Sequence, residues 1–167
     1  AYNGDTIREL LHYTDGKFAS VTALEPDRRS FRKLNEWASA NITGDVTLVQ
    51  AGAWNEDTVK CFTDQAGRQS RVAGQGKETQ MRALDSVLSG RACTYLKMDV
   101  EGAEREAIAG AEKTIRQYAP KLNVAAYHRS EDFFQLPLLI HALQPSYRLY
   151  LRHHPYVPAW DTNLYAI

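Results

Sequence analysis

The stretch TYLKMDVEGAE, residues 94–104, decides the fold class because it joins a strand pattern to a helix pattern. Its first half is apolar and predicts a buried strand, whereas the residues from Ala103 to Tyr118 carry apolar side chains at helical spacing. Two acids, Asp99 and Glu101, stand between these elements. Because an acid at the end of a buried strand is costly to desolvate, the pattern indicates that the protein uses at least one of them.

Strand and helix patterns alternate on both sides of this stretch. Further strands are predicted at 20–26, 45–51 and 121–128, helices at 27–40, 83–90, 103–118 and 131–143, and short extended pieces at 58–62, 71–74 and 78–81. The last two strand patterns, 146–156 and 161–167, are joined by a loop too short for a crossover helix and should pair antiparallel. The alternation predicts an α/β fold, with a doubly wound, mostly parallel sheet, helices on both faces and an antiparallel C-terminal strand pair.

Composition limits the classes of function. The chain has 167 residues, enough for one domain with a substantial core, and its 20 basic and 20 acidic residues give zero net charge. Nucleic acid and membrane surfaces are therefore not expected as partners. No apolar run approaches the roughly 20 residues that span a bilayer. Cys61 and Cys93 are far apart and not in metal-ligand spacing, so we expect a reduced, cytoplasmic protein without a disulfide framework. The absence of an obvious metal cluster favours a metal-independent mechanism, although Asp99 with a neighbour could hold a magnesium ion.

The carboxyl ends of the predicted strands are where such a sheet binds ligands. The polar or aromatic residues at these ends are Gly4, Asp5, Glu25, Trp54, Asp99, Glu101 and His128. Glu25 lies about 20 residues beyond the Gly4 turn, a spacing at which a carboxylate binds a nucleotide ribose, although it could simply cap the next helix. Trp54 is more typical of packing than of adenine binding.

His128 and the two acids of the central stretch each have a structural alternative. His128 could be an ordinary surface histidine. Either Asp99 or Glu101 could cap the helix near Ala103, and we expect Asp99 to be the one that points into the site.

Five segments together resemble the FkbM-type methyltransferases. They are AYNGDT at the start, LEPD, LDSVL, KMDVEGAEREAIAGAEKTI and the final NLYAI, in the order that the family has. The resemblance implies a Rossmann-like fold of class I methyltransferase type, and S-adenosyl-L-methionine as cofactor. It further implies O-methylation of a hydroxyl group on a small-molecule or saccharide acceptor. Because such a hydroxyl is a poor nucleophile at neutral pH, a base within hydrogen-bond reach should help, with His128 the first candidate and Asp99 the second. The segments 54–81 and 153–160 are the expected places for acceptor contacts.

The resemblance also implies roles for residues that contact the cofactor. The Gly4 turn would lie against the methionine portion with Asp5 nearby, and Glu25 would accept hydrogen bonds from both ribose hydroxyls. Ala53 and Trp54 would lie near the adenine. Asp99 would face the sulfonium and the acceptor, and a carboxylate there is partly compensated by the positive sulfur.

One departure and two alternatives accompany this interpretation. In the family a strand precedes AYNGDT, so we expect residues 1–167 to form a single methyltransferase domain whose first central strand is missing from the chain. A nucleotide-dependent oxidoreductase is disfavoured because no G-x-G-x-x-G occurs in the sequence. A non-catalytic Rossmann-like binding domain would keep Glu25 and Asp99 for structural reasons alone.

Overall fold

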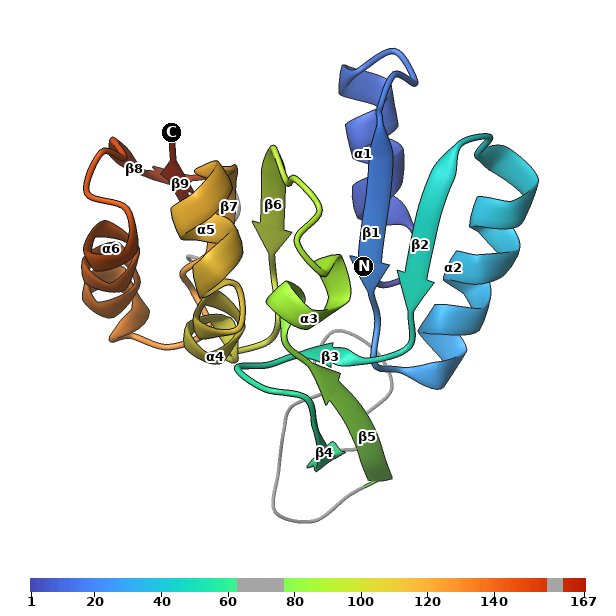
Figure 1. Ribbon diagram of the computed structural model, residues 1–167, viewed down its shortest axis with the longest axis horizontal. Coiled ribbons are helices and arrows are strands. Elements are labelled where there is room, and N and C mark those ends of the chain that lie inside the picture. Colours follow the sequence, from blue (N-terminus) through green and yellow to red (C-terminus); the bar gives the residue numbers. More distant parts are fainter. Residues whose placement is uncertain (63–76, 156–160) are drawn as a thin grey trace. The chain divides into compact units, whose positions relative to one another are not determined.

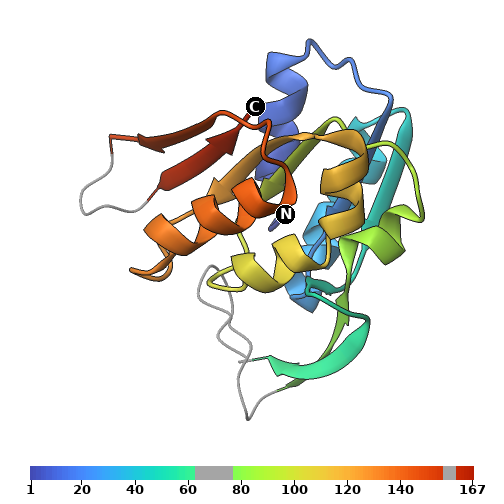
Figure 2. The same cartoon turned by 60° about the vertical axis from the view of Figure 1, so that its left-hand side comes forward.

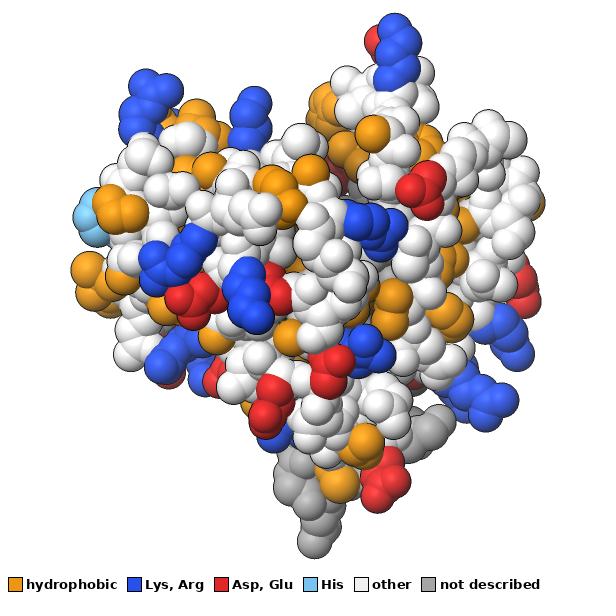
Figure 3. All heavy atoms as spheres, viewed as in Figure 1, with side chains coloured by type: hydrophobic (Ala, Val, Ile, Leu, Met, Phe, Trp, Pro, Cys, Tyr) orange, Lys and Arg blue, Asp and Glu red, His pale blue; other side chains and the backbone are white. Residues whose placement is uncertain are grey.

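The computed structural model describes residues 1–62, 77–155 and 161–167 (Figure 1). Within these ranges the chain forms two compact units, one of residues 1–52 and 58–81, the other of residues 53–57 and 82–167, and each is described by itself. The extended piece predicted at 71–74 lies outside the described residues. On the face viewed in Figure 3, basic and acidic side chains are interspersed, in keeping with the zero net charge.

The first unit contains the strand–helix–strand pattern that the sequence predicts. Its elements are α1 (Asp5–Tyr13), β1 (Ser20–Leu24), α2 (Arg28–Asn41) and β2 (Asp45–Val49). Strands β1 and β2 pair in parallel, with Ser20 opposite Asp45. The side chain of Asp27 accepts a hydrogen bond from Ser30 N at 2.8 Å and caps α2. Leu34 of α2 is fully buried against β1, which fixes the helix on the strand pair.

Three short strands follow β2. They are β3 (Gly52–Ala53), β4 (Thr58–Phe62) and β5 (Lys77–Arg82), in the order β3-β5-β4. Strands β4 and β5 are antiparallel, with Thr58 opposite Met81. The extended pieces predicted at 58–62 and 78–81 are therefore confirmed.

The second unit is built on a four-stranded sheet in the order β6-β7-β9-β8. Its strands are β6 (Tyr95–Met98), β7 (Lys121–Ala125), β8 (Leu149–His153) and β9 (Thr162–Ala166), and its helices are α3 (Leu84–Leu88), α4 (Glu104–Ala109), α5 (Glu112–Tyr118) and α6 (Asp132–Leu143). Strands β6 and β7 are parallel, and β9 pairs antiparallel with both β7 and β8. The predicted antiparallel tail is confirmed, and helices α4, α5 and α6 lie along one face of this sheet (Figure 1 and Figure 2).

The expectation of a mostly parallel sheet holds only in part. Parallel pairing is found in β1–β2 and β6–β7, whereas β4–β5, β7–β9 and β8–β9 are antiparallel. The fold is a mixed α/β arrangement with parallel and antiparallel pairing. None of the helices within the described residues is long and apolar enough to cross a bilayer.

The single helix predicted from Ala103 to Tyr118 is wrong in one respect, because it is broken at Gly110. A Cβ at Gly110 would lie 1.9 Å from the backbone oxygen of Trp54, so only glycine allows this approach. The amide of Asp85 donates to Gly110 O, and the Asp85 carboxylate accepts from the amides of Lys113 and Thr114, both at 2.9 Å. Asp85 therefore caps a new helix, α5, and this is the structural role of the acid in the segment LDSVL.

Candidate functional site

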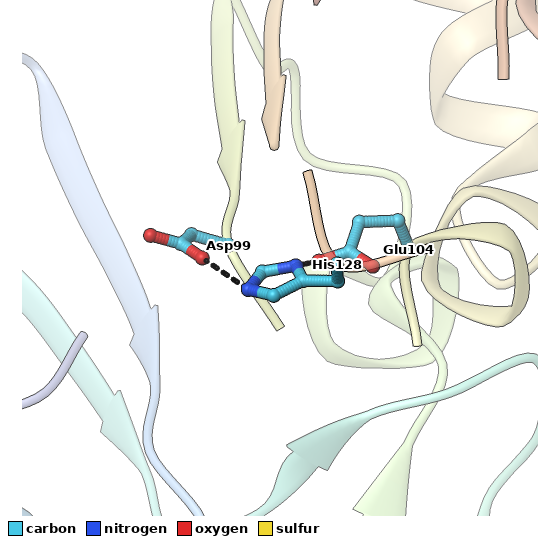
Figure 4. Close-up of side chains that lie close together, drawn as sticks. All are labelled: Asp99, Glu104 and His128. Carbon is cyan, nitrogen blue, oxygen red and sulfur yellow. Dashed lines mark hydrogen bonds and ion pairs between the residues drawn. The ribbon is translucent and has the colours of Figure 1, made fainter. Parts of the chain in front are cut away.

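The candidate site is a buried imidazole surrounded by three carboxylates. Asp99 follows the end of β6, and His128 follows the end of its parallel neighbour β7 (Figure 4). His128 Nε2 lies 3.6 Å from Asp99 Oδ1 and 3.5 Å from Glu101 Oε2, while Nδ1 lies 2.8 Å from Glu104 Oε1. The predicted meeting of Asp99 and His128 at one end of two neighbouring strands is therefore what the structure has.

A tight turn between β6 and α4 aims the carboxylates at the ring. Glu101 has φ +56° and Gly102 has φ +92°, so two successive left-handed residues reverse the chain within one turn. The turn brings Glu104 into the first turn of α4, where its Oε1 also accepts from Val100 N at 3.0 Å. The backbone of the motif and the histidine thus share one carboxylate oxygen.

The acids of the motif differ in their exposure. Asp99 is 40% exposed and accepts from Tyr127 Oη at 3.2 Å, whereas Glu104 is 1% exposed. The residue in the capping position of α4 is Ala103, which makes no side-chain cap hydrogen bond. The buried acid of the motif is therefore Glu104, which the strand-end argument did not select.

The acids around His128 outweigh the effect of its burial. Burial lowers the pKa of His128, but the Glu104 hydrogen bond and the charges of Glu104, Asp99 and Glu101 raise it, and the net pKa lies above its usual value. Burial and the charge of Asp99 raise the pKa of the neighbouring Tyr127, which keeps that phenol protonated as a donor to Asp99. The site therefore stabilises an imidazolium.

A second buried acid lies close to Glu104. Asp132, at the start of α6, is 1% exposed, and neither of its carboxylate oxygens has a hydrogen-bond partner among the described residues. Burial and the charge of Glu104 raise the pKa of Asp132, whereas Arg129 and His128 lower it. The raised pKa shifts the protonation equilibrium of Asp132 toward its neutral form, in keeping with the cost of a second buried charge next to Glu104.

Sequence reasoning missed Glu104, although the sequence contained a signal. Glu104 precedes Ala107, Ile108 and Ala111 by three, four and seven positions, so it lies on the apolar face of the predicted helix. A glutamate on such a face is rarely fully buried unless it is paired. Tyr127 was missed because a tyrosine at the end of a strand has no distinguishing pattern.

In the first unit, the residues predicted to bind the cofactor also have roles in holding the local structure. Gly4 has φ +94° before α1, and its Cβ position would lie 2.5 Å from the Trp37 ring, so glycine is required there. Asp5 begins α1, and its carboxylate accepts from Thr6 N. Glu25 is buried at the end of β1.

Backbone amides bind both oxygens of the Glu25 carboxylate. Oε2 accepts from Tyr2 N at 2.6 Å, and Oε1 accepts from Asp27 N at 3.0 Å. Since a carboxylate has roughly four acceptor positions, these two amides leave acceptor capacity for a ligand. The N-cap of α2 is Asp27, so Glu25 holds the backbone just before that helix and does not occupy the capping position weighed for it.

Ala53 and Trp54 lie in the second unit. Trp54 N donates to Arg82 O at 3.0 Å, and Asp57 bonds both Arg82 and Ala83 N, so this short segment is held against the start of α3.

The site also contains donors that suit a cation. One ligand atom each from Asp99, Glu104 and His128 lies within 4.8 Å of the others. The imidazole stands between the two acids, however, and Glu104 is already bonded to Nδ1 (Figure 4). This arrangement is that of a histidine oriented by Glu104. Of the three residues, only Asp99 and Nε2 of His128 would remain to bind a cation.

Comparison with known proteins identifies the family of the chain. The family model of the methyltransferase FkbM domain matches residues 1–158. The chain belongs to the FkbM methyltransferase family. No curated protein matches it.

Two solved structures resemble this FkbM domain. The methyltransferase FkbM of Methylobacillus flagellatus KT is 31% identical, with a TM-score of 0.83 over 100% of this chain and 41% of that one. SMU.1697c of Streptococcus mutans, provisionally assigned as a methyltransferase and solved in complex with SAH, has a TM-score of 0.54 at 12% identity, over 99% of this chain and 82% of that one. The second likeness concerns the fold alone. The chain spans about two fifths of the first protein's length.

Proposed function

We propose that this FkbM domain uses S-adenosyl-L-methionine to methylate a hydroxyl group of a small-molecule or saccharide acceptor. The observation that carries the proposal is the buried His128 beside Asp99 at the ends of two parallel strands. The family assignment and the fold shared with an SAH complex support the cofactor. As finer parts of the same proposal, residues 1–167 form one methyltransferase domain, and its sheet is doubly wound.

The donor set suits this cofactor chemically. When bound, S-adenosylmethionine supplies a methyl carbon on a positively charged sulfur, and the electrons of the broken carbon–sulfur bond return to that sulfur. Asp99 is assigned to the sulfonium, because its partly exposed carboxylate complements a positive charge. Glu25 is assigned to the ribose through the remaining acceptor capacity of its carboxylate, Gly4 and Asp5 to the methionine portion, and Ala53 and Trp54 to the adenine.

His128 is assigned as the general base. The proton of the acceptor hydroxyl passes to Nε2, and the oxygen forms its new bond to the methyl carbon. The imidazolium produced is stabilised by the carboxylates of Glu104, Asp99 and Glu101. Holding the acceptor oxygen in line with the transferred carbon is the remaining task of the protein.

Calorimetric titration of the full-length protein with S-adenosylhomocysteine tests the cofactor assignment. Glu25→Ala should abolish binding and Glu25→Gln should weaken it, while Glu36→Ala, which removes an exposed acid from α2, should bind like the wild type. His128→Ala should retain binding and lose turnover. A folded wild-type protein that binds nicotinamide cofactor instead would indicate an oxidoreductase, and one that binds neither would indicate a non-catalytic domain.

A further inference from the structure

We propose that Glu104 is a positioning residue that fixes the tautomer and orientation of His128, so that Nε2 is the nitrogen presented to the acceptor hydroxyl. This inference rests on the proposed function of His128 as base. Glu104 lies in the first turn of α4 and is fully buried, so it has no access to the substrate itself.

The tautomer follows from the two sides of the ring. A carboxylate oxygen accepts hydrogen bonds and does not donate them, so the 2.8 Å contact with Glu104 Oε1 requires the proton on Nδ1. In the neutral imidazole Nε2 then carries the lone pair. Its distances to Asp99 and Glu101, 3.6 and 3.5 Å, exceed the 2.7–3.2 Å that is typical of an N–H···O hydrogen bond, so no acid is bonded to it directly.

Orientation follows from the way Glu104 is held. Its Oε1 accepts from Val100 N as well as from the ring, so the carboxylate is fixed to the backbone of the turn. The ring of Tyr127 packs against the imidazole at 4.2 Å between centroids and limits rotation from the other side. A rotation of the ring that exchanged its nitrogens would break the only short hydrogen bond that the described residues make to it.

The surrounding charges determine how the site responds to pH. Asp99 and Glu101 face Nε2, Glu104 faces Nδ1, and Asp132 lies close enough to Glu104 that the Glu104 charge raises the pKa of its carboxyl. Arg129 is the basic residue of this group, and its charge lowers the pKa of Asp132. Removing the Glu104 charge should lower the pKa of His128, so the rise of the rate with pH should move to lower pH.

Two measurements on the full-length protein test the proposal. The first is long-range ¹H–¹⁵N NMR of the five histidines, with His128 assigned from a His128→Gln variant. The neutral wild-type ring should carry its proton on Nδ1, and in Glu104→Gln the His128 pKa should fall. A proton on Nε2 in the neutral wild-type ring, or an unchanged pKa in the variant, would overturn the proposal. The wild-type spectrum decides even where the variant fails to fold.

The second measurement is the pH profile of methyl transfer. Glu104→Gln should lower kcat roughly 10²-fold, the lower end of what a general base contributes, with little change in cofactor affinity. Glu104→Asp should restore part of the rate. Glu112→Gln, which removes an exposed acid of α5, is the matched control and should leave rate and pKa unchanged. A shifted His128 pKa with an unchanged rate would refute the role in the reaction, whereas absence of cofactor binding in the wild type would refute the proposed function and leave the NMR result standing.

Discussion

Asp85 provides a test of why the helix after the motif is broken. Its Oδ1 accepts from Thr114 N at 2.9 Å and Thr114 Oγ1 at 2.7 Å, and its Oδ2 accepts from Lys113 N at 2.9 Å. Asp85→Ala leaves all three donors without this partner. Loss of a helix cap costs about 0.5–2 kcal/mol, and hydrogen bonds to charged groups contribute about 1.5–3 kcal/mol each. Because two of the bonds share one oxygen and the third is exposed, we expect a total of about 3 kcal/mol.

Urea unfolding of the variants measures this loss. Asp85→Asn keeps the oxygen that binds Thr114 and should lose only about 1 kcal/mol. Glu112→Ala removes a charge from the same end of α5 without removing a cap, and should change the free energy of unfolding by about 0.5 kcal/mol. For a protein of this size, 3 kcal/mol corresponds to a Tm lowered by about 6–12 °C. An Asp85→Ala protein as stable as the Glu112→Ala protein would refute the assignment of Asp85 as the cap.

Two further changes test the packing at Gly110 and the charge state of Asp132. Gly110→Ala places a methyl group against the Trp54 backbone and should lower the free energy of unfolding by about 3 kcal/mol. Gly90→Ala, at φ +81° with open space around it, should lower it by only about 1 kcal/mol. Equal losses in thermal melts would contradict the close approach of Gly110 to Trp54. Asp132 has a raised pKa in the folded protein, so its contribution to stability is greatest below its unfolded pKa of about 3.9 and falls as pH rises through the folded value. Asp132→Asn should therefore be more stable than the wild type near pH 7 and should flatten the pH dependence in urea titrations; a less stable variant at that pH would show that the carboxylate is needed.

The elements that the sequence predicted correctly are those with strong local signals. The helix at Arg28–Asn41 has a capping Asp27 and regular apolar spacing, and both survive in the fold. The break at Gly110 could not be predicted, because it depends on Trp54, a residue 56 positions away whose backbone occupies the space of a side chain. Periodicity continues through such a break since the apolar face stays buried on both sides. Close approaches between distant segments leave no periodic signal.

The site was predictable to the level of strand ends and no further. Parallel strands place their carboxyl ends together, which is why Asp99 and His128 could be expected to meet. Which acid is buried was not predictable from position alone, because the turn at Glu101 and Gly102 reverses the chain and carries Glu104 inward while Asp99 stays 40% exposed. The positive φ of Gly102 is the local feature that separates the buried Glu104 from the exposed Asp99.

The spacing D-V-E-G-A-E in the motif has a single physical explanation in this structure. Asp99 and Glu101 must approach one ring nitrogen and Glu104 the other, and these nitrogens lie on different sides of the imidazole (Figure 4). A continuous strand or helix could not present three nearby acids in this way, since i and i+2 on a strand share a face while i and i+3 share one on a helix. The left-handed turn lets the first two acids stay at the strand end and the third begin the helix. The motif therefore encodes the surroundings of a histidine that lies 24 residues beyond its last acid.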